Sequence, residues 1–274
     1  MTLLLKLVLA PALVVASSMA GRRWGPGLTG VLVALPIVAG PILLITTLEH
    51  GTRFGAAAAS SSLLGLVSLA LFAVVFSWCS RRTGWVASLA AAWVACLAAD
   101  VALAPLSVPP WWGFAVVLLA LWAASRALPP DAPPPDRRPP VAWPWWDLPG
   151  RAVATAALVV IVTGLSGTLG PGMTGVLAPF PIASSVVAAF TLAQHGSAET
   201  VRLLRGLLAG LLGFAVFCLL VALLVDELGT APAFGIALAG TVVTQLARQH
   251  VLRRRRLRRP SGRNRVPRRA RMDP

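Results

Sequence analysis

The chain has 274 residues, of which 57% are hydrophobic and only 12% charged, and its formal net charge is +15. Soluble domains have about 25% charged residues, so this composition excludes an ordinary soluble protein and indicates a multi-pass membrane protein. Helices are the expected spanning elements, because a lipid-facing barrel would show short segments of alternating polarity rather than long apolar runs. The fold class that we predict is all-α and polytopic.

Nine apolar stretches long enough to cross the hydrocarbon follow one another along the chain. They cover residues 2–20, 27–48, 55–79, 85–107, 111–128, 151–168, 173–194, 203–225 and 231–249. The first stretch could be a cleavable signal peptide, since SSMA precedes Gly21. We interpret it as a span, because Lys6 alone makes a weak basic region and Arg22 and Arg23 would resist export.

One segment of the chain occurs twice. Residues 25–51 read GPGLTGVLVALPIVAGPILLITTLEHG, residues 170–196 read GPGMTGVLAPFPIASSVVAAFTLAQHG, and 12 of the 27 positions are identical. The same offset of 145 residues pairs Gly65 with Gly210, Phe72 with Phe217 and Gly84 with Gly229. Composition alone rarely produces ordered matches of Gly, Pro, Thr and His, so we interpret the two segments as copies of one module.

Positive charge alternates between the linkers that join the spans. A basic linker follows every odd-numbered span, whereas the intervening linkers have few positive charges. The arginines after odd-numbered spans are Arg22, Arg23, Arg81, Arg82, Arg126, Arg137, Arg138, Arg151, Arg202 and Arg205, and an arginine-rich tail follows the ninth span. Cytoplasmic loops are rich in Lys and Arg, so we predict a cell inner membrane protein with its N-terminus outside and its C-terminus in the cytoplasm.

The repeat and the charge pattern together predict an inverted repeat of four, one and four spans. Residues 1–107 form the first copy, residues 108–128 contain the connecting fifth span, and residues 151–249 form the second copy. A Pro-rich cytoplasmic linker covers residues 129–150, and residues 250–274 are expected to be a disordered polybasic tail. Because an odd span separates the copies, they cross the bilayer in opposite senses, as in many transporters.

Two short patterns surround the motif span of the second copy. The residues that form Gly-x-x-x-x-Phe-Pro and then Gly…Glu-x-x-Arg are Gly175, Phe180, Pro181, Gly196, Glu199 and Arg202. In the first copy Gly30 and Pro36 match, Leu35 replaces the phenylalanine, and no Glu-x-x-Arg follows His50. Each half thereby resembles the GlpM-like group of small four-helix bacterial membrane proteins. The resemblance implies two fused four-helix modules and no particular reaction.

Helices interrupted by Gly and Pro stand at matching places in the two copies. The GPGxTG segment opens spans two and seven, and a second proline follows about ten residues later, which is about 15 Å along a helix and near mid-bilayer. Paired interruptions of this kind indicate a substrate path at the repeat interface; the alternative is that small residues simply allow close helix packing. The path candidates in these helices are Thr29, Gly30, Pro36, Thr174, Gly175, Pro179 and Pro181.

A few polar residues within or at the ends of spans are further candidates. Asp100 lies well inside span four, and Gln245 occupies the matching position in the second copy. A carboxylate within a span indicates function; the alternative is that span four ends early and Asp100 is interfacial. Glu49, His50 and His195 close the motif helices and could relay protons, or could be polar helix ends at the membrane surface.

Other side chains are expected to have structural roles. Thr46 and Thr191, which match across the copies, should bond to their own helix backbones. Lys6 and its counterpart Arg151 are expected to snorkel to the membrane surface. Tryptophans at span ends should anchor the helices at the interface; they are Trp24, Trp78, Trp85, Trp111 and Trp112.

Known catalytic and metal-binding motifs are absent from the sequence. Cys79, Cys96 and Cys218 have no CxxC spacing, and we find no nucleophile elbow, phosphate loop or carboxylate pair. We therefore expect no enzyme, no cofactor and no metal site. The arginine tail should contact anionic lipid, with nucleic acid as the less favoured partner, and the pattern is compatible with a homo-oligomer.

These features lead to one functional hypothesis and one alternative. The hypothesis is a transporter-like protein that moves a small solute or ion. Almost no charge lines the predicted path, which disfavours a highly charged substrate and is compatible with a neutral, hydrophobic or small cationic one. The alternative is a non-transporting membrane assembly or partner-binding protein. A midplane cavity open to one side would favour transport, and a solid bundle would favour the alternative.

Overall fold

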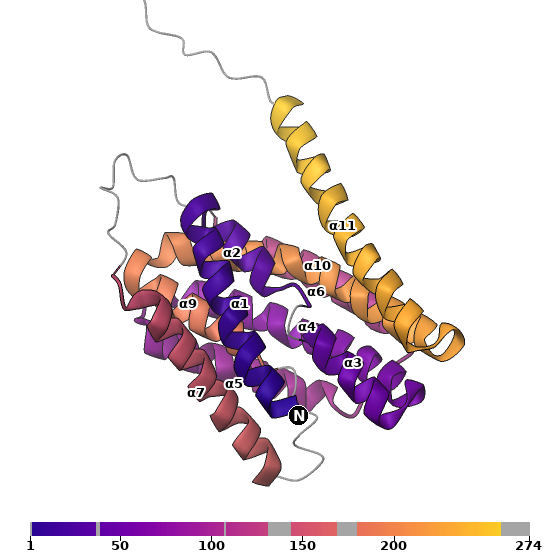
Figure 1. Ribbon diagram of the computed structural model, residues 1–274. Coiled ribbons are helices and arrows are strands. Elements are labelled where there is room, and N and C mark those ends of the chain that lie inside the picture. The colour runs from indigo at the N-terminus through magenta and orange to yellow at the C-terminus, as the bar shows by residue number, and fades with distance from the viewer. Residues whose placement is uncertain (1, 37–38, 107, 131–143, 169–179, 259–274) are drawn as a thin grey trace, which may run out of the picture.

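A computed structural model describes residues 2–36, 39–106, 108–130, 144–168 and 180–258, and their regular structure is entirely helical. This confirms the all-α fold class. The described residues form ten helices (Figure 1). They are α1 (Thr2–Trp24), α2 (Pro26–Val33), α3 (Ala39–His50), α4 (Thr52–Cys79), α5 (Trp85–Leu103), α6 (Pro110–Ala127), α7 (Asp147–Thr168), α9 (Ile182–His195), α10 (Ser197–Leu228) and α11 (Thr230–Arg258).

Five of the described helices are long and apolar enough to cross a membrane: α4, α5, α6, α10 and α11. They overlap the predicted spans three, four, five, eight and nine. The chain is therefore a helical membrane protein of the multi-pass class. Apolar side chains on the outer faces of α5, α6 and α11 are exposed, as expected of surfaces that contact lipid; among them are Val94, Val101, Leu119, Trp122, Leu238, Val242, Val243 and Leu246.

The predicted second span is not one helix. It is divided into α2, which ends at Val33, and α3, which begins at Ala39. The helix stops where Pro36 lacks a backbone N–H and its ring would clash with the preceding turn. The backbone N–H of Gly40 bonds to the Pro36 carbonyl at 2.8 Å and so joins the two pieces. The expected proline interruption is confirmed in this copy, in the stronger form of a broken helix.

The boundaries around the linker and the tail also differ from the prediction. Helix α7 begins at Asp147, within the segment expected to be linker, because Asp147 is buried against neighbouring helices. Helix α11 continues to Arg258, so residues 250–258 are helical rather than disordered, and Figure 1 shows the end of this helix extending beyond the bundle. The rest of the tail and residues 131–143 lie outside the described residues.

Helices α4 and α10 pack against each other at the centre of the bundle. Helix α4 also packs against α3 and α5, which are its neighbours in the chain. Helix α10 packs in the same way against its chain neighbours α9 and α11. Helix α6 contacts both α4 and α10, and α1 lies beside α7 (Figure 1). The core side chains of this arrangement include Phe72 and Phe217, which match across the repeat and are both fully buried.

Helix α2 crosses α10 at backbone contact. Glycines on both helices make this possible, since a Cβ on Gly30 would fall on the Leu203 carbonyl oxygen, and a Cβ on Gly206 would fall on the Gly27 carbonyl oxygen. One turn further along α10, a Cβ on Gly210 would lie 2.6 Å from the Val31 carbonyl oxygen. Gly30 therefore allows close helix packing at this crossing, which is the alternative role considered for the motif glycines.

Candidate functional site

A buried carboxylate joins three helices at one end of the bundle. Asp147, in the first turn of α7, is 0% exposed. Its Oδ2 atom accepts a hydrogen bond of 2.8 Å from Arg22 of α1, and its Oδ1 atom accepts bonds of 2.9 Å from Nε of Arg151 and 2.7 Å from Nε2 of Gln194 on α9. We call these four residues the Asp147 cluster. It holds α1, α7 and α9 together through charged hydrogen bonds.

The local sequence explains how the cluster forms. Asp147 and Arg151 are four residues apart on α7, so both side chains lie on one helical face. A carboxylate in the first turn is also stabilised by the helix dipole. Arg22 lies in the last turn of α1, where a positive charge is favoured for the same reason. The antiparallel packing of α1 and α7 brings these two helix ends together.

The environment of Asp147 fixes its charge. Burial by itself would raise the pKa of this carboxyl group, because a charged group loses its hydration. The hydrogen bond from Arg22, the charge of Arg151 and the hydrogen bonds from Gln194 and Arg151 act in the opposite direction, and the net effect lowers the pKa of Asp147 below its ordinary value. Asp147 is therefore a carboxylate at neutral pH, balanced by two guanidinium groups.

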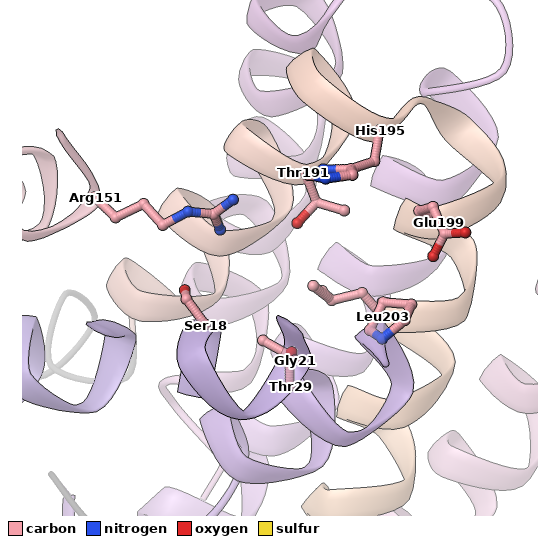
Figure 2. Close-up of a pocket in the computed structure, with 9 residues that line it drawn as sticks. Ser18, Gly21, Thr29, Arg151, Thr191, His195, Glu199 and Leu203 are labelled. Carbon is pink, nitrogen blue, oxygen red and sulfur yellow. The ribbon is translucent and has the colours of Figure 1, made fainter. Parts of the chain in front are cut away.

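Next to the Asp147 cluster lies a small polar cavity of about 70 Å³ (Figure 2). Helices α1, α2, α7, α9 and α10 all contribute to its wall, so it lies between residues of both predicted repeat copies. Its lining residues are Ser18, Gly21, Pro26, Thr29, Arg151, Thr191, His195, Glu199 and Leu203. Besides the arginine, five of these side chains can donate or accept hydrogen bonds, so the wall can bind a polar occupant.

The buried polar side chains of the wall differ in whether they have hydrogen-bond partners. Thr191 donates its hydroxyl to the Val187 carbonyl at 2.7 Å. Arg151 is 2% exposed, uses Nε for Asp147, and places its guanidinium 5.2 Å from the ring of Phe190. The hydroxyl of Ser18, which is 5% exposed, has no hydrogen-bond partner among the described residues. The Ser18 hydroxyl is thus a buried donor without an acceptor among the described residues.

The Glu-x-x-Arg pattern forms an ion pair in the first turn of α10. Glu199 Oε1 lies 3.1 Å from Nη1 of Arg202. Glu199 faces the cavity, and Arg202 neutralises its charge from the helix surface. The pattern therefore places a compensated carboxylate at the cavity wall.

The structure brings together only part of the predicted path. Thr29 and His195 both line the polar cavity. Gly30 lies one residue further along α2, at the crossing with α10, and Pro36 is buried at the break between α2 and α3. Pro181 is the N-cap of α9 and is buried. Thr174, Gly175 and Pro179 lie outside the described residues.

Asp100 and Gln245 occupy equivalent places away from the cavity. Asp100 is 5% exposed on α5, its Oδ2 atom lies 3.8 Å from the Cys96 thiol, and Ser68 of α4 lies beside it. Gln245 of α11 donates to the Gly210 carbonyl at 3.0 Å. Asp100 is therefore buried between protein helices, in the last turn of α5, which ends at Leu103 rather than at the predicted limit of 107.

Glu49 and His50 do not join this site. Both are exposed at the end of α3, and His50 stacks on Phe54 and contacts the Thr46 carbonyl at 3.1 Å. They match the polar helix-end interpretation, and no contact with the cavity supports a relay through them. Thr46 and Thr191 do bond to their own helix backbones, as predicted.

Two features of the site differ from the sequence-based expectation or were missed by it. Arg151 does not snorkel; it is buried because Asp147 supplies a counter-charge inside the protein. Asp147 was not recognised, although an acidic residue four positions before an arginine at a helix start is a readable signal. Ser18 gave no signal, since nothing in a sequence shows which hydroxyl of a helix will lack an acceptor.

The remaining polar and thiol groups do not form a second centre in the described part of the chain. Among those residues, no three His, Cys, Asp or Glu side chains gather closely enough to hold a metal ion. Cys96 and Cys218 are buried free thiols and Cys79 is half-buried. The tryptophans at the helix ends are exposed as anchors would be; they are Trp24, Trp78, Trp85, Trp111 and Trp112.

Comparison of the chain with protein-family models, with curated proteins and with solved structures finds no match. Functional inference therefore depends on the residues of this chain. Their arrangement provides a polar cavity and a buried charge cluster at one end of a membrane-spanning bundle, and an interrupted helix, α2–α3, that begins beside the cavity.

Proposed function

We propose that this protein is an inverted-repeat, transporter-like membrane protein that moves a small solute or ion. The observation that supports it most is the polar cavity, which lies between helices of both copies and beside the start of the broken helix α2–α3. Transporters of this plan place their sites at the repeat interface, next to discontinuous helices. Thr29 and His195 are the sequence-predicted residues that belong to this path, with Arg151 added from the structure.

Helix packing supports the inverted repeat. A two-fold axis would exchange α4 with α10, α5 with α11 and α3 with α9. The pairs α4–α5 and α10–α11, α4–α3 and α10–α9, and α5–α9 and α11–α3 all pack together. The connecting helix α6 contacts both central helices, as an element outside the repeat can. We propose that the axis runs in the membrane plane through the α4–α10 contact, with the α2–α3 and Pro181 interruptions beside it.

Single residues support the same relation. Gly51 and Gly196 match in the repeat, and both have positive φ, 91° and 82°, where a helix ends and the next begins. Asp100 lies beside Ser68, and their repeat positions, Gln245 and Gly213, are neighbours too. The resemblance to the GlpM-like group remains a proposal about each module, in which Glu199 and Arg202 would serve the cavity.

Contacts between helix ends support the proposed orientation. Arg22 in the last turn of α1 donates to Asp147, Trp78 at the end of α4 donates to the Ala127 carbonyl at 2.7 Å, and Arg205 near the start of α10 donates to the Pro129 carbonyl at 2.8 Å. All of these groups lie at or near helix ends that the arginine pattern assigns to the cytoplasmic side. On this basis the polar cavity lies near the cytoplasmic surface.

We expect single cysteines introduced at exposed positions just after α4 and at the end of α10 to label from opposite sides. In a cysteine-free background, Arg82→Cys should react only with a membrane-permeant maleimide in intact cells, and Glu227→Cys should react with an impermeant one. Both positions are exposed, so accessibility differs only through the bilayer. Labelling of both positions by the impermeant reagent would contradict the orientation and the inverted repeat with it.

A non-transporting assembly or partner-binding protein is the second candidate. The small volume of the cavity and its place at one end of the bundle, rather than at the midplane, favour this alternative. The positively charged end of α11 would then be the docking element.

Transport is tested by flux into proteoliposomes that contain the full-length protein. We expect faster equilibration of at least one small solute, from a panel of potassium, chloride, nitrate, urea and glycerol, than in protein-free vesicles. Asp100→Asn should reduce this flux while leaving the melting temperature unchanged, because a buried titratable carboxylate indicates function and Gln245 already provides an amide at the matching position. No protein-dependent flux for any member of the panel would favour the non-transporting alternative, and unchanged flux in Asp100→Asn would remove that residue from the path.

A further inference from the structure

We propose that the polar cavity binds one small inorganic anion through the side chains of Ser18 and Arg151. Binding of the anion does not depend on the proposed function. Only the further step, that this anion is the transported solute, rests on that function. An anion differs from the neutral or cationic solute that the sequence led us to expect. That expectation placed the charge of Arg151 at the membrane surface, whereas the structure places it inside the protein.

The first observation is the hydroxyl of Ser18. Serine and threonine hydroxyls in helices usually donate to a carbonyl three or four residues earlier, and Ser17, Thr47 and Ser77 do so here. Ser18 makes no such bond among the described residues although it is 5% exposed and lines the cavity. Figure 2 shows its oxygen on the same side as the guanidinium of Arg151. A buried donor without an acceptor calls for a ligand that accepts hydrogen bonds.

The second observation is the placement of Arg151. Its Nε atom is occupied by Asp147, and Figure 2 shows the end of the guanidinium reaching toward the cavity. Asp147 fixes the orientation of the side chain, and the ring of Phe190 lies 5.2 Å from its central carbon. A guanidinium held in this way presents planar N–H donors to an anion without first having to be ordered.

The third observation is the balance of charge. The Asp147 cluster and the ion pair that Glu199 of the wall makes with Arg202 together include three arginines, Arg22, Arg151 and Arg202, and two carboxylates, Asp147 and Glu199. Within this set of side chains the arginines outnumber the carboxylates by one. The N-terminus of α2 at Pro26 also faces the cavity and adds a favourable field for an anion. This surplus of arginines over carboxylates favours an anion over a cation.

The volume limits the size of the occupant. A water molecule takes about 30 Å³ of the liquid, so a cavity of about 70 Å³ has room for an ion of a few heavy atoms. Sugars, amino acids and nucleotides are larger than this volume. Chloride and nitrate have both the charge and the size that the cavity allows.

Binding is measured by thermal unfolding of the full-length protein in detergent, followed through its tryptophan fluorescence. The sodium salts of chloride and nitrate are titrated at constant ionic strength against gluconate, which is too large to enter. We expect chloride or nitrate to raise the melting temperature with saturation, because a ligand that binds only the folded state stabilises it. A melting temperature equal to that in gluconate for both anions would overturn the proposal.

Two variants and a control test the assignment of residues. Ser18→Ala should weaken anion affinity about tenfold, equivalent to one lost hydrogen bond of about 1.4 kcal/mol, without lowering the melting temperature in gluconate. Glu199→Gln should tighten binding, because it removes the negative charge at the wall and releases Arg202. Ser17→Ala is the matched serine control, because the Ser17 hydroxyl is donated to Val14.

The outcomes separate this inference from the proposed function. Wild-type affinity in folded Ser18→Ala, or weaker binding in Glu199→Gln, would overturn the anion site whatever the flux results are. Saturable binding that Ser18→Ala weakens, together with no anion flux in proteoliposomes, would support the anion site and contradict transport of the anion. Flux of chloride or nitrate that is lost in Ser18→Ala would support both.

Discussion

Replacement of Asp147 by asparagine should lower the free energy of unfolding by about 3 kcal/mol. Removing one partner from a buried ion pair leaves the other charge uncompensated, which costs about 3–5 kcal/mol in buried sites. We expect the low end of this range, because the side chain of Arg22 is 26% exposed and keeps some hydration. The amide would also point at least one N–H toward a donor, since Arg22, Arg151 and Gln194 all donate to this carboxylate.

The measurement is chemical unfolding in detergent, with Asp226→Asn as the control. Asp226 is an exposed carboxylate on α10, so its substitution should change the free energy of unfolding by no more than about 0.5 kcal/mol. A double variant with Arg22→Gln should be destabilised by less than the two single variants added together, because both single changes break the same bond. Equal stability of Asp147→Asn and the wild type would mean that the cluster does not hold α1 and α7 together.

Protonation of Asp147 should make the stability of the protein depend on pH. The pKa of Asp147 is lowered in the folded protein, so the unfolded chain takes up this proton first as the pH falls. The stabilisation from the cluster is therefore complete above the unfolded pKa of about 3.9 and is lost as the pH falls through the folded pKa. Stability measured from pH 6 down to pH 3 should fall more steeply in the wild type than in Asp147→Asn.

The sequence was sufficient for the helical membrane class and for the rough positions of the spans. Helices α4, α5 and α6 begin or end within a few residues of the predicted limits, because length and hydropathy alone define them. The break in span two was indicated by Pro36, but whether a proline bends or divides a helix depends on what packs beside it. Here α2 is held against α10 by glycine contacts, while α3 packs on α4.

The candidate site was only partly readable, for a different reason. Thr29 and His195 were found because the repeat singled out their segments, and both line the cavity. Arg151 was interpreted as a surface charge, since an arginine at the start of a span normally reaches water. Its burial depends on Asp147 and on Arg22, which is more than a hundred residues away in sequence. Long-range pairing of this kind has no periodicity or spacing that a single sequence reveals.

Substitution of Gly206 by alanine should also destabilise the protein strongly, by about 2–3 kcal/mol. The added methyl group would fall on the Gly27 carbonyl oxygen, which belongs to the backbone and cannot turn away. Inserting atoms into a packed contact forces backbone shifts that cost about 1–3 kcal/mol, and here two helices would have to separate. Gly30→Ala should behave similarly, because its methyl group would meet the Leu203 carbonyl oxygen from the other side of the same crossing.

Gly235→Ala provides the matched control for this crossing. Gly235 lies within α11, and a Cβ there would meet nothing within 4 Å. Alanine is favoured over glycine in a helix by about 1 kcal/mol, so this variant should be as stable as the wild type or more so. A loss of stability in Gly206→Ala but not in Gly235→Ala would therefore report the close approach of α2 and α10 and not a general effect of losing glycine. Because α2 and α10 both line the polar cavity, separating them should also weaken the binding of its occupant; full stability in Gly206→Ala would show that the two backbones are not in contact.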